Sequence, residues 1–318
     1  MIVITGAAGF IGSSMVRHLN ESGRSDLVLV DDFPPMPVET CHGASLHDVK
    51  FLEKIPRDFF FDWLSLNQQK LDFIIHLGSE IDTLPENTAC FQEKILEFSQ
   101  RLWSFAAMNR IPLLFAASST EDKWYWTGHE WTVGENLQIA EAERLKRQFD
   151  QWVLKQRITP PLWAGFAVPE VYGPNESHLG DAASSVFQLF RQWQKEGRVV
   201  IPLYENSESS DNEPLLDRIF VKDVVTVFTW FINHLPASGF YYLGTGYPRP
   251  LSTVAATLFS VLKQLPQVEY QLISSEIPYS QNRNLEMFNK INRVGYKKNF
   301  TPLEKGIRLY LKKYLSMF

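Results

Sequence analysis

The chain has 318 residues, of which 45% are hydrophobic and 21% are charged, and its formal net charge is −5. This composition is typical of a globular protein with one large domain or two closely packed units. Because no basic block is present to neutralise phosphates, we expect no nucleic-acid partner. The apolar runs are too short to cross a bilayer and the first residues lack a signal-peptide pattern, so we expect no membrane partner and a cytoplasmic location.

Apolar strand-like runs alternate with helical patterns through the first half of the chain. The runs predicted as buried parallel strands are 1–5, 27–31, 72–78, 112–119 and 161–168. The stretches predicted as helices are 10–22, parts of 50–70, 89–109 and 138–156. This alternation predicts an α/β fold, a Rossmann doubly wound parallel sheet with helices on both faces.

The pattern changes after about residue 170. Residues 204–217 are polar and acidic, which predicts a surface loop or a partly disordered flap. The pattern then predicts a strand and a helix over 218–235, and a strand that ends in a turn over 239–246. We expect two parts, a Rossmann domain and a smaller α/β lobe for a substrate, made respectively of 1–168 plus 218–245 and of 169–217 plus 246–318.

Three glycines lie between the first predicted strand and the first predicted helix. Gly6, Gly9 and Gly12 form the run GAAGFIG. Glycines permit a tight turn and let backbone N–H groups approach a pyrophosphate, and the helix N-terminus adds a favourable dipole. The alternative is a turn that only packs a helix on a strand, with Asp31 as a solvated strand end. The strand–turn–helix context is the one that a dinucleotide site requires, so the sequence predicts such a site.

Two carboxylates follow the second predicted strand. Asp31 ends LVLVD at the position where a carboxylate accepts hydrogen bonds from ribose hydroxyls. It would repel a 2′-phosphate, and Asp32 adds to this repulsion. No Lys or Arg occurs between Asp32 and Lys50. The sequence therefore favours NAD over NADP as the cofactor.

Several motifs, in order along the chain, resemble those of a known family. TGAAGFIGS has the form found in extended short-chain dehydrogenase/reductases, the NAD-dependent epimerases and dehydratases of sugar nucleotides. DFIIHLGS, VYGPNESHLG, RIFVKDVV and FYYLGTG are similar to their later segments. FDQWV and NRVGYKKNFTPLEKGIRLYL are specifically similar to the ADP-L-glycero-D-manno-heptose 6-epimerase family, which makes a lipopolysaccharide precursor. The resemblance covers essentially the whole chain.

The resemblance implies epimerisation through a transient ketone. Such an enzyme uses bound NAD(P)⁺ to remove hydride from a sugar carbon and returns it to the opposite face. A base must take the hydroxyl proton. In this superfamily the base is the Tyr of Y-x-x-x-K, assisted by a Ser or Thr and by the Lys, which lowers the pKa of the Tyr and holds the nicotinamide ribose. The heptose epimerases have a second base, a Lys in an H-K-G segment.

This chain departs from the resembled pattern at both bases. Aligning FDQWV places Lys146 at the family lysine and Ala142 at the tyrosine, and no Y-x-x-x-K occurs anywhere in the chain. Leu179 stands at the second base, and Glu170 stands where the family has Asn. Methyl and isobutyl groups cannot accept a proton, and removing a general base typically costs roughly 10²- to 10⁴-fold in rate.

The resemblance also implies which residues keep a role. The candidate catalytic residues are Ser119, Lys146 as a remnant, and Glu170. The candidate substrate-binding residues are His178 and Ser119. The candidate cofactor-binding residues are Gly6, Gly9, Phe10, Ile11, Gly12, Asp31, Asp32, Leu77 and Lys146. We expect no metal site.

Four of the candidate side chains outside the glycine run have a structural alternative. Lys146 either contacts the cofactor or is a solvated helix lysine. Ser119 either meets a ligand at the sheet edge or caps the next turn. His178 either titrates in a reaction or lies at the surface. Glu170 either acts as a base with a raised pKa or is hydrogen-bonded to neighbouring backbone.

Two further features lie near the lost tyrosine. Glu141 and Glu143 flank Ala142, and successive helix residues point about 100° apart, so we expect both carboxylates to face elsewhere. The aromatic segment KWYWTGHEW at 123–131 is compatible with a lid, with packing of an irregular loop, or with a patch for a partner chain.

We expect an NAD-binding relative of the heptose epimerases that binds a nucleotide sugar, similar to ADP-heptose, as a homo-oligomer, with epimerase turnover weak or absent. One alternative is an active NAD-dependent epimerase, dehydratase or reductase with a relocated base at Glu170, His178 or Lys123. Another is a non-catalytic scaffold or regulatory subunit.

Overall fold

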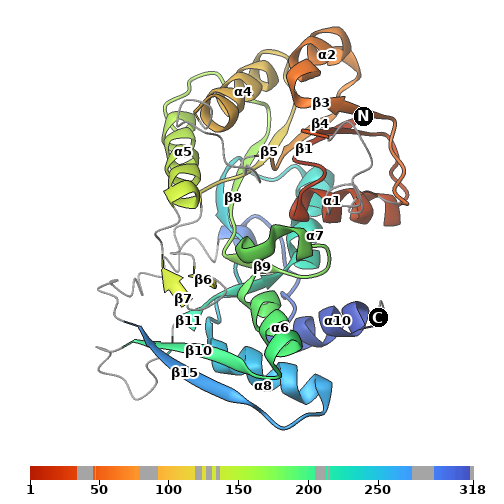
Figure 1. Cartoon of the computed structure of the whole chain (residues 1–318). Helices are drawn as coiled ribbons and strands as arrows, with labels where there is room; N and C mark the ends of the chain where they lie inside the picture. Colours follow the sequence, from red (N-terminus) through yellow and green to blue (C-terminus); the bar gives the residue numbers. More distant parts are fainter. Residues whose placement is uncertain are drawn as a thin grey trace.

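A computed structural model gives the fold of the chain (Figure 1). The residues that it describes are 1–33, 46, 48–78, 92–118, 124–126, 131–133, 137–204, 213, 215–273 and 290–315. Two candidate residues, Ser119 and Lys123, therefore lie outside the described residues.

A seven-stranded sheet carries the first part of the chain, and every pairing in it is parallel. Its order is β13-β8-β5-β4-β1-β2-β3. The strand bounds are β1 Ile2–Thr5, β2 Leu27–Asp31, β3 Glu53–Pro56, β4 Phe73–His76, β5 Leu113–Ala116, β8 Trp163–Ala167 and β13 Gly239–Tyr242. The chain runs outward from β1 to β3 and then returns to place β4 beside β1. In such sheets ligands bind at the carboxyl ends of the strands where the order reverses, here between β1 and β4.

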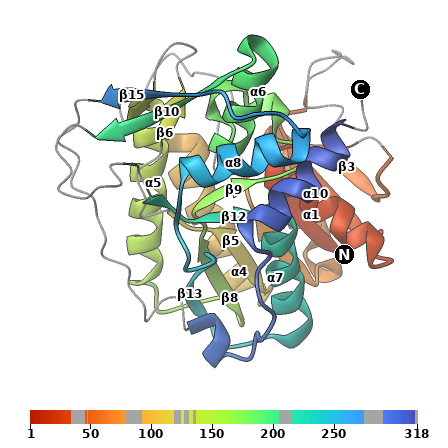
Figure 2. The ribbon, with the colours of Figure 1, turned by 90° about the horizontal axis from the view of Figure 1, so that it is seen from below.

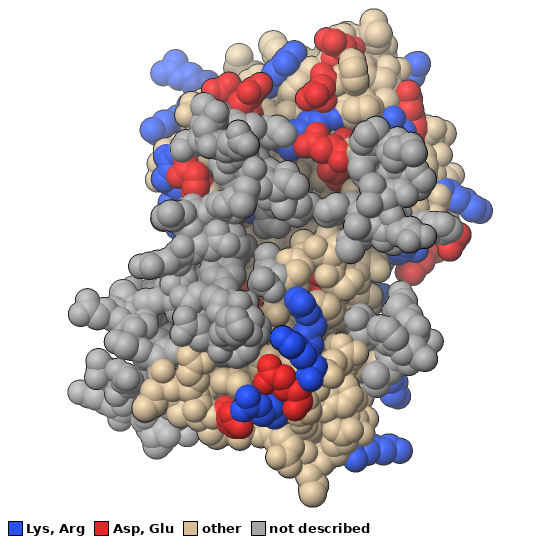
Figure 3. Space-filling model, viewed as in Figure 1, with Lys and Arg blue, Asp and Glu red and all other residues tan. Residues whose placement is uncertain are grey.

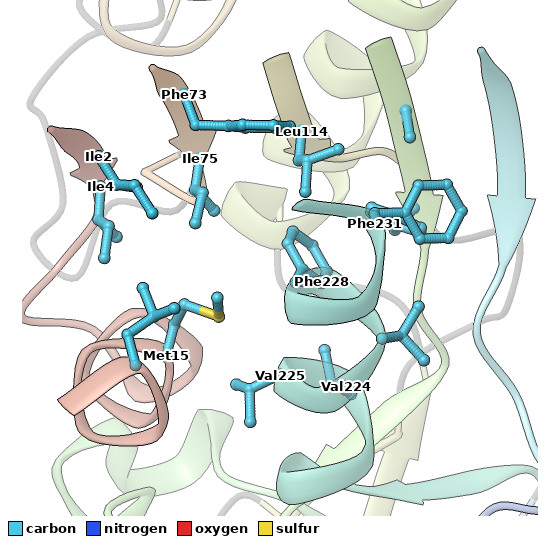
Figure 4. Close-up of a cluster of buried hydrophobic side chains, with 14 of the residues drawn as sticks. Ile2, Ile4, Met15, Phe73, Ile75, Leu114, Val224, Val225, Phe228 and Phe231 are labelled. Atoms are coloured by element: carbon cyan, nitrogen blue, oxygen red, sulfur yellow. The ribbon is translucent and has the colours of Figure 1, made fainter. Parts of the chain in front are cut away.

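Alternate side chains of the strands bury two opposite faces of this sheet. Ile2 and Ile4 belong to one apolar cluster and Val3 to another, as the pleat of a strand requires. Figure 4 shows the first cluster, in which strand side chains meet Met15 and Phe228. Each such side chain contributes about 1.5–3 kcal/mol when it is fully buried. Both faces are therefore covered, as the doubly wound prediction requires.

Helices from distant parts of the sequence pack on the two faces of the sheet (Figure 1). The helices on the first face are α1 Phe10–Glu21 and α7 Val221–His234. The helices on the second face are α2 Phe60–Asn67, α4 Phe98–Met108 and α5 Leu137–Val153. Short 3-10 turns at Arg57–Phe59 and Gln68–Lys70 flank α2.

The helices that form a second apolar core lie below the sheet in the view of Figure 1. Figure 2, turned by 90° from Figure 1, shows its helices from below. Its helices are α6 Ser185–Glu196, α8 Leu251–Leu262 and α10 Leu303–Leu315. The strands that contribute to it are β9 Glu170–Tyr172, β10 Val199–Tyr204, β12 Arg218–Phe220 and β15 Val268–Ile273. The short strands β11 Leu215–Leu216 and β14 Arg249–Pro250 pair with each other. The ladder of β9 and β12 joins the two cores, because Ile219 belongs to the first and Phe220 to the second.

The sequence-based fold class is confirmed by this architecture. The five strands predicted in the first half correspond to β1, β2, β4, β5 and β8. The helix predicted over 89–109 is divided, with a π-helical segment at Gln92–Glu97 before α4. Most of the loop predicted over 204–217 lies outside the described residues.

The surface of the described part carries both signs of charge. Figure 3 shows Lys and Arg side chains interspersed with Asp and Glu side chains on one face. In the described residues, no helix is long and apolar enough to span a membrane.

Candidate functional site

The glycine run forms a tight turn from β1 into α1. Gly6 has φ +68°, and a Cβ added at Gly12 would lie 1.9 Å from the carbonyl oxygen of Gly6. The first α-helical hydrogen bond runs from the N–H of Ser13 to the oxygen of Gly9, so the N–H groups of residues 10–12 precede it. Phe10 is buried, which fixes the start of the helix. The turn therefore places backbone N–H groups at the sheet edge, and at the glycines no Cβ blocks access to them.

Asp31 lies at the end of β2, next to this turn. Its Oδ2 accepts the N–H of Ala8 at 2.7 Å, and its Oδ1 accepts the N–H of Asp32 at 2.8 Å. The carboxylate is partly exposed, and Asp32 is exposed. A glycine cradle at a helix N-terminus with a carboxylate on the neighbouring strand is the donor and acceptor set that a dinucleotide requires. The residues present therefore fit NAD.

The end of β4 packs directly against the glycine turn. A Cβ added at Gly78 would lie 2.8 Å from the nitrogen of Gly6. The N–H of Leu77 donates to the carbonyl oxygen of Thr5 at 3.1 Å. The structure thus places Leu77 beside the turn, at the point where the strand order reverses.

A buried polar chain holds this junction together. The Nδ1 of His76 lies 2.7 Å from Oγ1 of Thr5, and its Nε2 lies 2.9 Å from Oγ of Ser99. The hydroxyl of Ser99 donates to the carbonyl oxygen of Ile95. Burial and the nearby charges of Arg57 and Lys146 lower the pKa of His76 to about 3. His76 is therefore neutral at physiological pH and serves the structure of the site.

Helix α5 brings Lys146 and Ala142 to the second face of the sheet. Lys146 is 6% exposed, and its Nζ lies 3.1 Å from Oε1 of Glu143. It is therefore not a solvated helix lysine. Ala142 is 8% exposed and forms a small apolar cluster with Ile95 and Leu145. The sequence prediction that Glu143 faces elsewhere is wrong, because its long side chain reaches Lys146, three residues later on the same helix.

Asp150 is a residue of this region that the sequence analysis missed. It lies one turn after Lys146, and its Oδ2 accepts the N–H of Ser118 at 2.9 Å, just after β5. Its Oδ1 is buried without a hydrogen-bond partner among the described residues. Burial, followed by the charge of Glu143, raises the pKa of Asp150 to about 7 against the opposing effect of the Ser118 N–H. The spacing Lys146–Asp150 was the signal that could have indicated a shared helix face.

Glu170, at the start of β9, is bound by residues far away in the sequence. Its Oε1 accepts the N–H of Ser185 at 2.7 Å, and its Oε2 accepts the hydroxyl of Ser185 at 2.8 Å. Nε of Arg218 lies 2.7 Å from Oε2. The carboxylate is thus hydrogen-bonded, but to α6 and β12 rather than to adjacent backbone. A catalytic role for Glu170 stays a prediction.

The segment after β9 carries His178 and Leu179, both half-buried, in a 3-10 turn. Glu176, which the sequence analysis missed, is 0% exposed and accepts N–H groups from Gly173 and Ser184 at 3.0 and 2.7 Å. Burial raises the pKa of Glu176 to about 7. Its carboxylate ties together the two ends of the segment that holds His178.

The structure brings the cofactor candidates together but describes only part of the catalytic set. The glycine turn, Asp31 and Leu77 lie at the carboxyl edge of the sheet. Lys146 is close enough to this edge for its charge to lower the pKa of His76. Residues of the aromatic segment lie in two strands that pair antiparallel, β6 Trp124–Trp126 and β7 Trp131–Val133. No group of three or more potential metal ligands gathers among the residues that the structure describes.

Relatives named as heptose epimerases match nearly the whole chain. It is 27% identical over 334 residues to an ADP-L-glycero-D-manno-heptose-6-epimerase of Fusobacterium nucleatum, covering 99% of this chain and 98% of the relative. It is 28% identical over 318 residues to the enzyme of the same name from Brachyspira hyodysenteriae, covering 98% and 96%.

Solved structures share the fold. The ADP-L-glycero-D-manno-heptose-6-epimerase of Helicobacter pylori superposes with a TM-score of 0.72 at 23% identity, covering 99% of this chain and 96% of that one. The UDP-glucose 4-epimerase of Thermus thermophilus, in complex with NAD, gives 0.69 at 18% identity, covering 100% and 99%. The model of the NAD dependent epimerase/dehydratase family matches residues 2–244. With the glycine turn, Asp31 and the reversed strand order in place, the chain belongs to the NAD dependent epimerase/dehydratase family.

Proposed function

We propose that this chain binds NAD together with a nucleotide sugar similar to ADP-heptose, and that its epimerase turnover is weak or absent. The family match and the whole-length similarity to heptose epimerases support the ligand class. A role near lipopolysaccharide synthesis, a cytoplasmic location, assembly as a homo-oligomer and the division into a Rossmann domain and a substrate lobe stay predictions alongside it.

The residues at the sheet edge have separate tasks in this proposal. The N–H groups of the turn from Gly6 to Gly12 bind the pyrophosphate, and Asp31 accepts hydrogen bonds from a ribose. Lys146 is the candidate for a contact with the second ribose. When NAD is bound, it supplies an acceptor for hydride.

The proposal rests on Ala142, which lies on α5 one turn before Lys146. In the family resemblance a phenol occupies this position, and here a methyl group packs against Ile95 and Leu145. Neither Ala142 nor Leu179 can exchange a proton. Lys146 is also held by Glu143, whose negative charge opposes the lowering of any nearby acid's pKa.

The test compares the wild type with a variant in which both bases are restored. Purified protein with NAD is incubated with ADP-heptose, and epimerised product is measured for the wild type and for Ala142→Tyr/Leu179→Lys. We expect product above background for the double variant only. The matched control is Ala142→Phe/Leu179→Met, which adds similar bulk without proton-exchanging groups and should stay inactive.

Turnover of ADP-heptose by the wild type at a rate ordinary for this family would contradict the proposal. Activity of the wild type on another sugar nucleotide would instead support a relocated base. In that case Glu170→Gln should flatten the pH–rate profile if Glu170 is that base.

A further inference from the structure

The N-terminus of α6 is occupied by an anion that belongs to the chain itself. The carboxylate of Glu170 accepts the N–H of Ser185, in the first turn of the helix, and also the hydroxyl of Ser185. Arg218 completes the set, with Nε 2.7 Å from the carboxylate and 2.8 Å from Oγ of Ser185. We call these donors of Ser185 and Arg218 the anion site.

The anion site is built by the backbone and by buried contacts. In the parallel ladder of β9 and β12, Glu170 lies opposite Arg218. Arg218 is 2% exposed, and its Nη1 donates to the carbonyl oxygens of Leu216 and Arg249 at 3.4 and 2.9 Å, which fixes the guanidinium. Helix α6 has 12 residues and no acidic residue in its first turn, so its dipole favours an anion.

The carboxylate does not satisfy all of the donors. The anion site offers the N–H and hydroxyl of Ser185 and two nitrogens of Arg218, Nε and Nη2. Nη2 is buried and has no hydrogen-bond partner among the described residues. A carboxylate brings two oxygens, and both are used. A phosphoryl group brings three, and its geometry suits both nitrogens of a guanidinium edge.

The location favours a ligand rather than a structural ion pair alone. Glu170 comes three residues after the end of β8, a strand of the seven-stranded sheet, and ligands of such sheets lie beyond the carboxyl ends of the strands. Its side chain is 19% exposed, in contrast to 1% for that of Arg218. The carboxylate therefore lies between the buried donors and the surface.

We propose that Ser185 and Arg218 form a phosphoryl-binding site in which Glu170 acts as a built-in competitor. While the Glu170 carboxylate occupies the anion site, it blocks the donors and its negative charge repels a phosphorylated ligand. Removing the carboxylate opens the site to an external oxyanion of the phosphate or diphosphate class. This inference goes beyond the proposed function and does not depend on it, because its test compares pyrophosphate binding between variants that all keep the glycine turn unchanged.

The experiment measures inorganic pyrophosphate binding to the full chain, by calorimetry and by thermal melting. We expect Glu170→Ala to melt below the wild type without ligand, because the buried Arg218 charge loses its partner. Pyrophosphate should restore much of this loss and bind at least about tenfold more tightly than to the wild type. The matched control is Glu269→Ala, on β15, which removes the same charge from an exposed ion pair with Arg198.

A second variant separates the anion site from general charge effects. In Glu170→Ala/Arg218→Met the guanidinium is gone, so the added pyrophosphate affinity should disappear. ADP and inorganic phosphate, tested in parallel, distinguish a diphosphate ligand from a single phosphate. If Glu170→Ala does not fold alone, we expect it to refold in pyrophosphate and not in sodium chloride of equal ionic strength.

Three results would overturn the inference. The first is a pyrophosphate affinity of Glu170→Ala no higher than that of Glu269→Ala. The second is an equal gain in pyrophosphate affinity in Glu170→Ala/Arg218→Met. The third is a failure of Glu170→Ala to refold in pyrophosphate as well as in sodium chloride.

Discussion

Asp150 shows how a single side chain links helix α5 to the sheet. Its carboxylate receives the N–H of Ser118 just beyond β5, while the second oxygen is buried without a partner among the described residues. The family resemblance points to Lys146 and Ala142 on the same helix. The structure adds Glu143 and Asp150, so that Lys146 lies between two carboxylates along α5.

The raised pKa of Asp150 gives the folded protein a pH dependence that we expect to be measurable. Between its ordinary value of 3.8 and about 7, the folded state holds a proton that the unfolded state has released. The free energy of unfolding of the wild type therefore falls as pH rises through this range. Asp150→Asn keeps an acceptor for Ser118 and removes the titration.

Urea unfolding at several pH values checks this expectation. Relative to the wild type, Asp150→Asn should gain about 2 kcal/mol in free energy of unfolding between about pH 4 and pH 8. Asp72→Asn, at an exposed carboxylate that pairs with the N-terminus, is the control. A stability difference for Asp150→Asn that is independent of pH would show that Asp150 titrates normally.

The contact between the end of β4 and the glycine turn sets the shape of the cofactor site. Gly6 and Gly78 approach so closely that neither position has room for a Cβ. Thr5 and His76, one and two residues away from these glycines, are hydrogen-bonded to each other. Strand register and a buried hydrogen bond together hold the two backbones at this distance.

Gly78→Ala tests this contact. The added Cβ would lie 2.8 Å from the nitrogen of Gly6, so we expect a loss of about 1–3 kcal/mol in free energy of unfolding and a weaker affinity for NAD. Gly9→Ala is the control within the same turn, since its Cβ would lie 3.3 Å from the oxygen of Gly6. Equal stability of Gly78→Ala and the wild type would show that the two backbones separate at little cost.

The elements that the sequence predicts are those with a strong local pattern. Apolar runs mark β1, β2 and β4, and a glycine run between strand and helix marks the turn. Strand β3 is not predicted, because Glu53–Pro56 has a single buried residue and is a strand through its pairing with β2. The π-helical segment before α4 likewise has no signature in the local apolar pattern.

The candidate site is predictable to the extent that its parts are close in sequence or follow a known motif. Arg218, the partner of Glu170, is 48 positions further along the chain, and only the pairing of β9 with β12 places it opposite Glu170. The prediction for Glu143 is wrong because the direction of a Cα–Cβ bond does not determine where a long carboxylate ends. Such contacts depend on tertiary packing, which a single sequence does not display.

Two apolar cores, joined at β9 and β12, organise the molecule as a whole (Figures 1 and 2). The first core fixes the sheet edge that carries the glycine turn and Asp31. The second holds α6, with the anion site at its N-terminus. We infer that the dinucleotide-binding turn persists in this chain, which has Ala142 and Leu179 at the positions that the family resemblance assigns to the two bases.

The measurement that tests this inference most directly is a calorimetric titration of NAD into the wild type and into Gly12→Ala. The Cβ of the variant would lie 1.9 Å from the oxygen of Gly6, so the turn must open. We expect one NAD per wild-type chain and an affinity at least about tenfold weaker for Gly12→Ala, in keeping with the loss of one or more backbone hydrogen bonds to the pyrophosphate. No binding to the wild type, or equal binding to both proteins, would contradict the persistence of a working dinucleotide site.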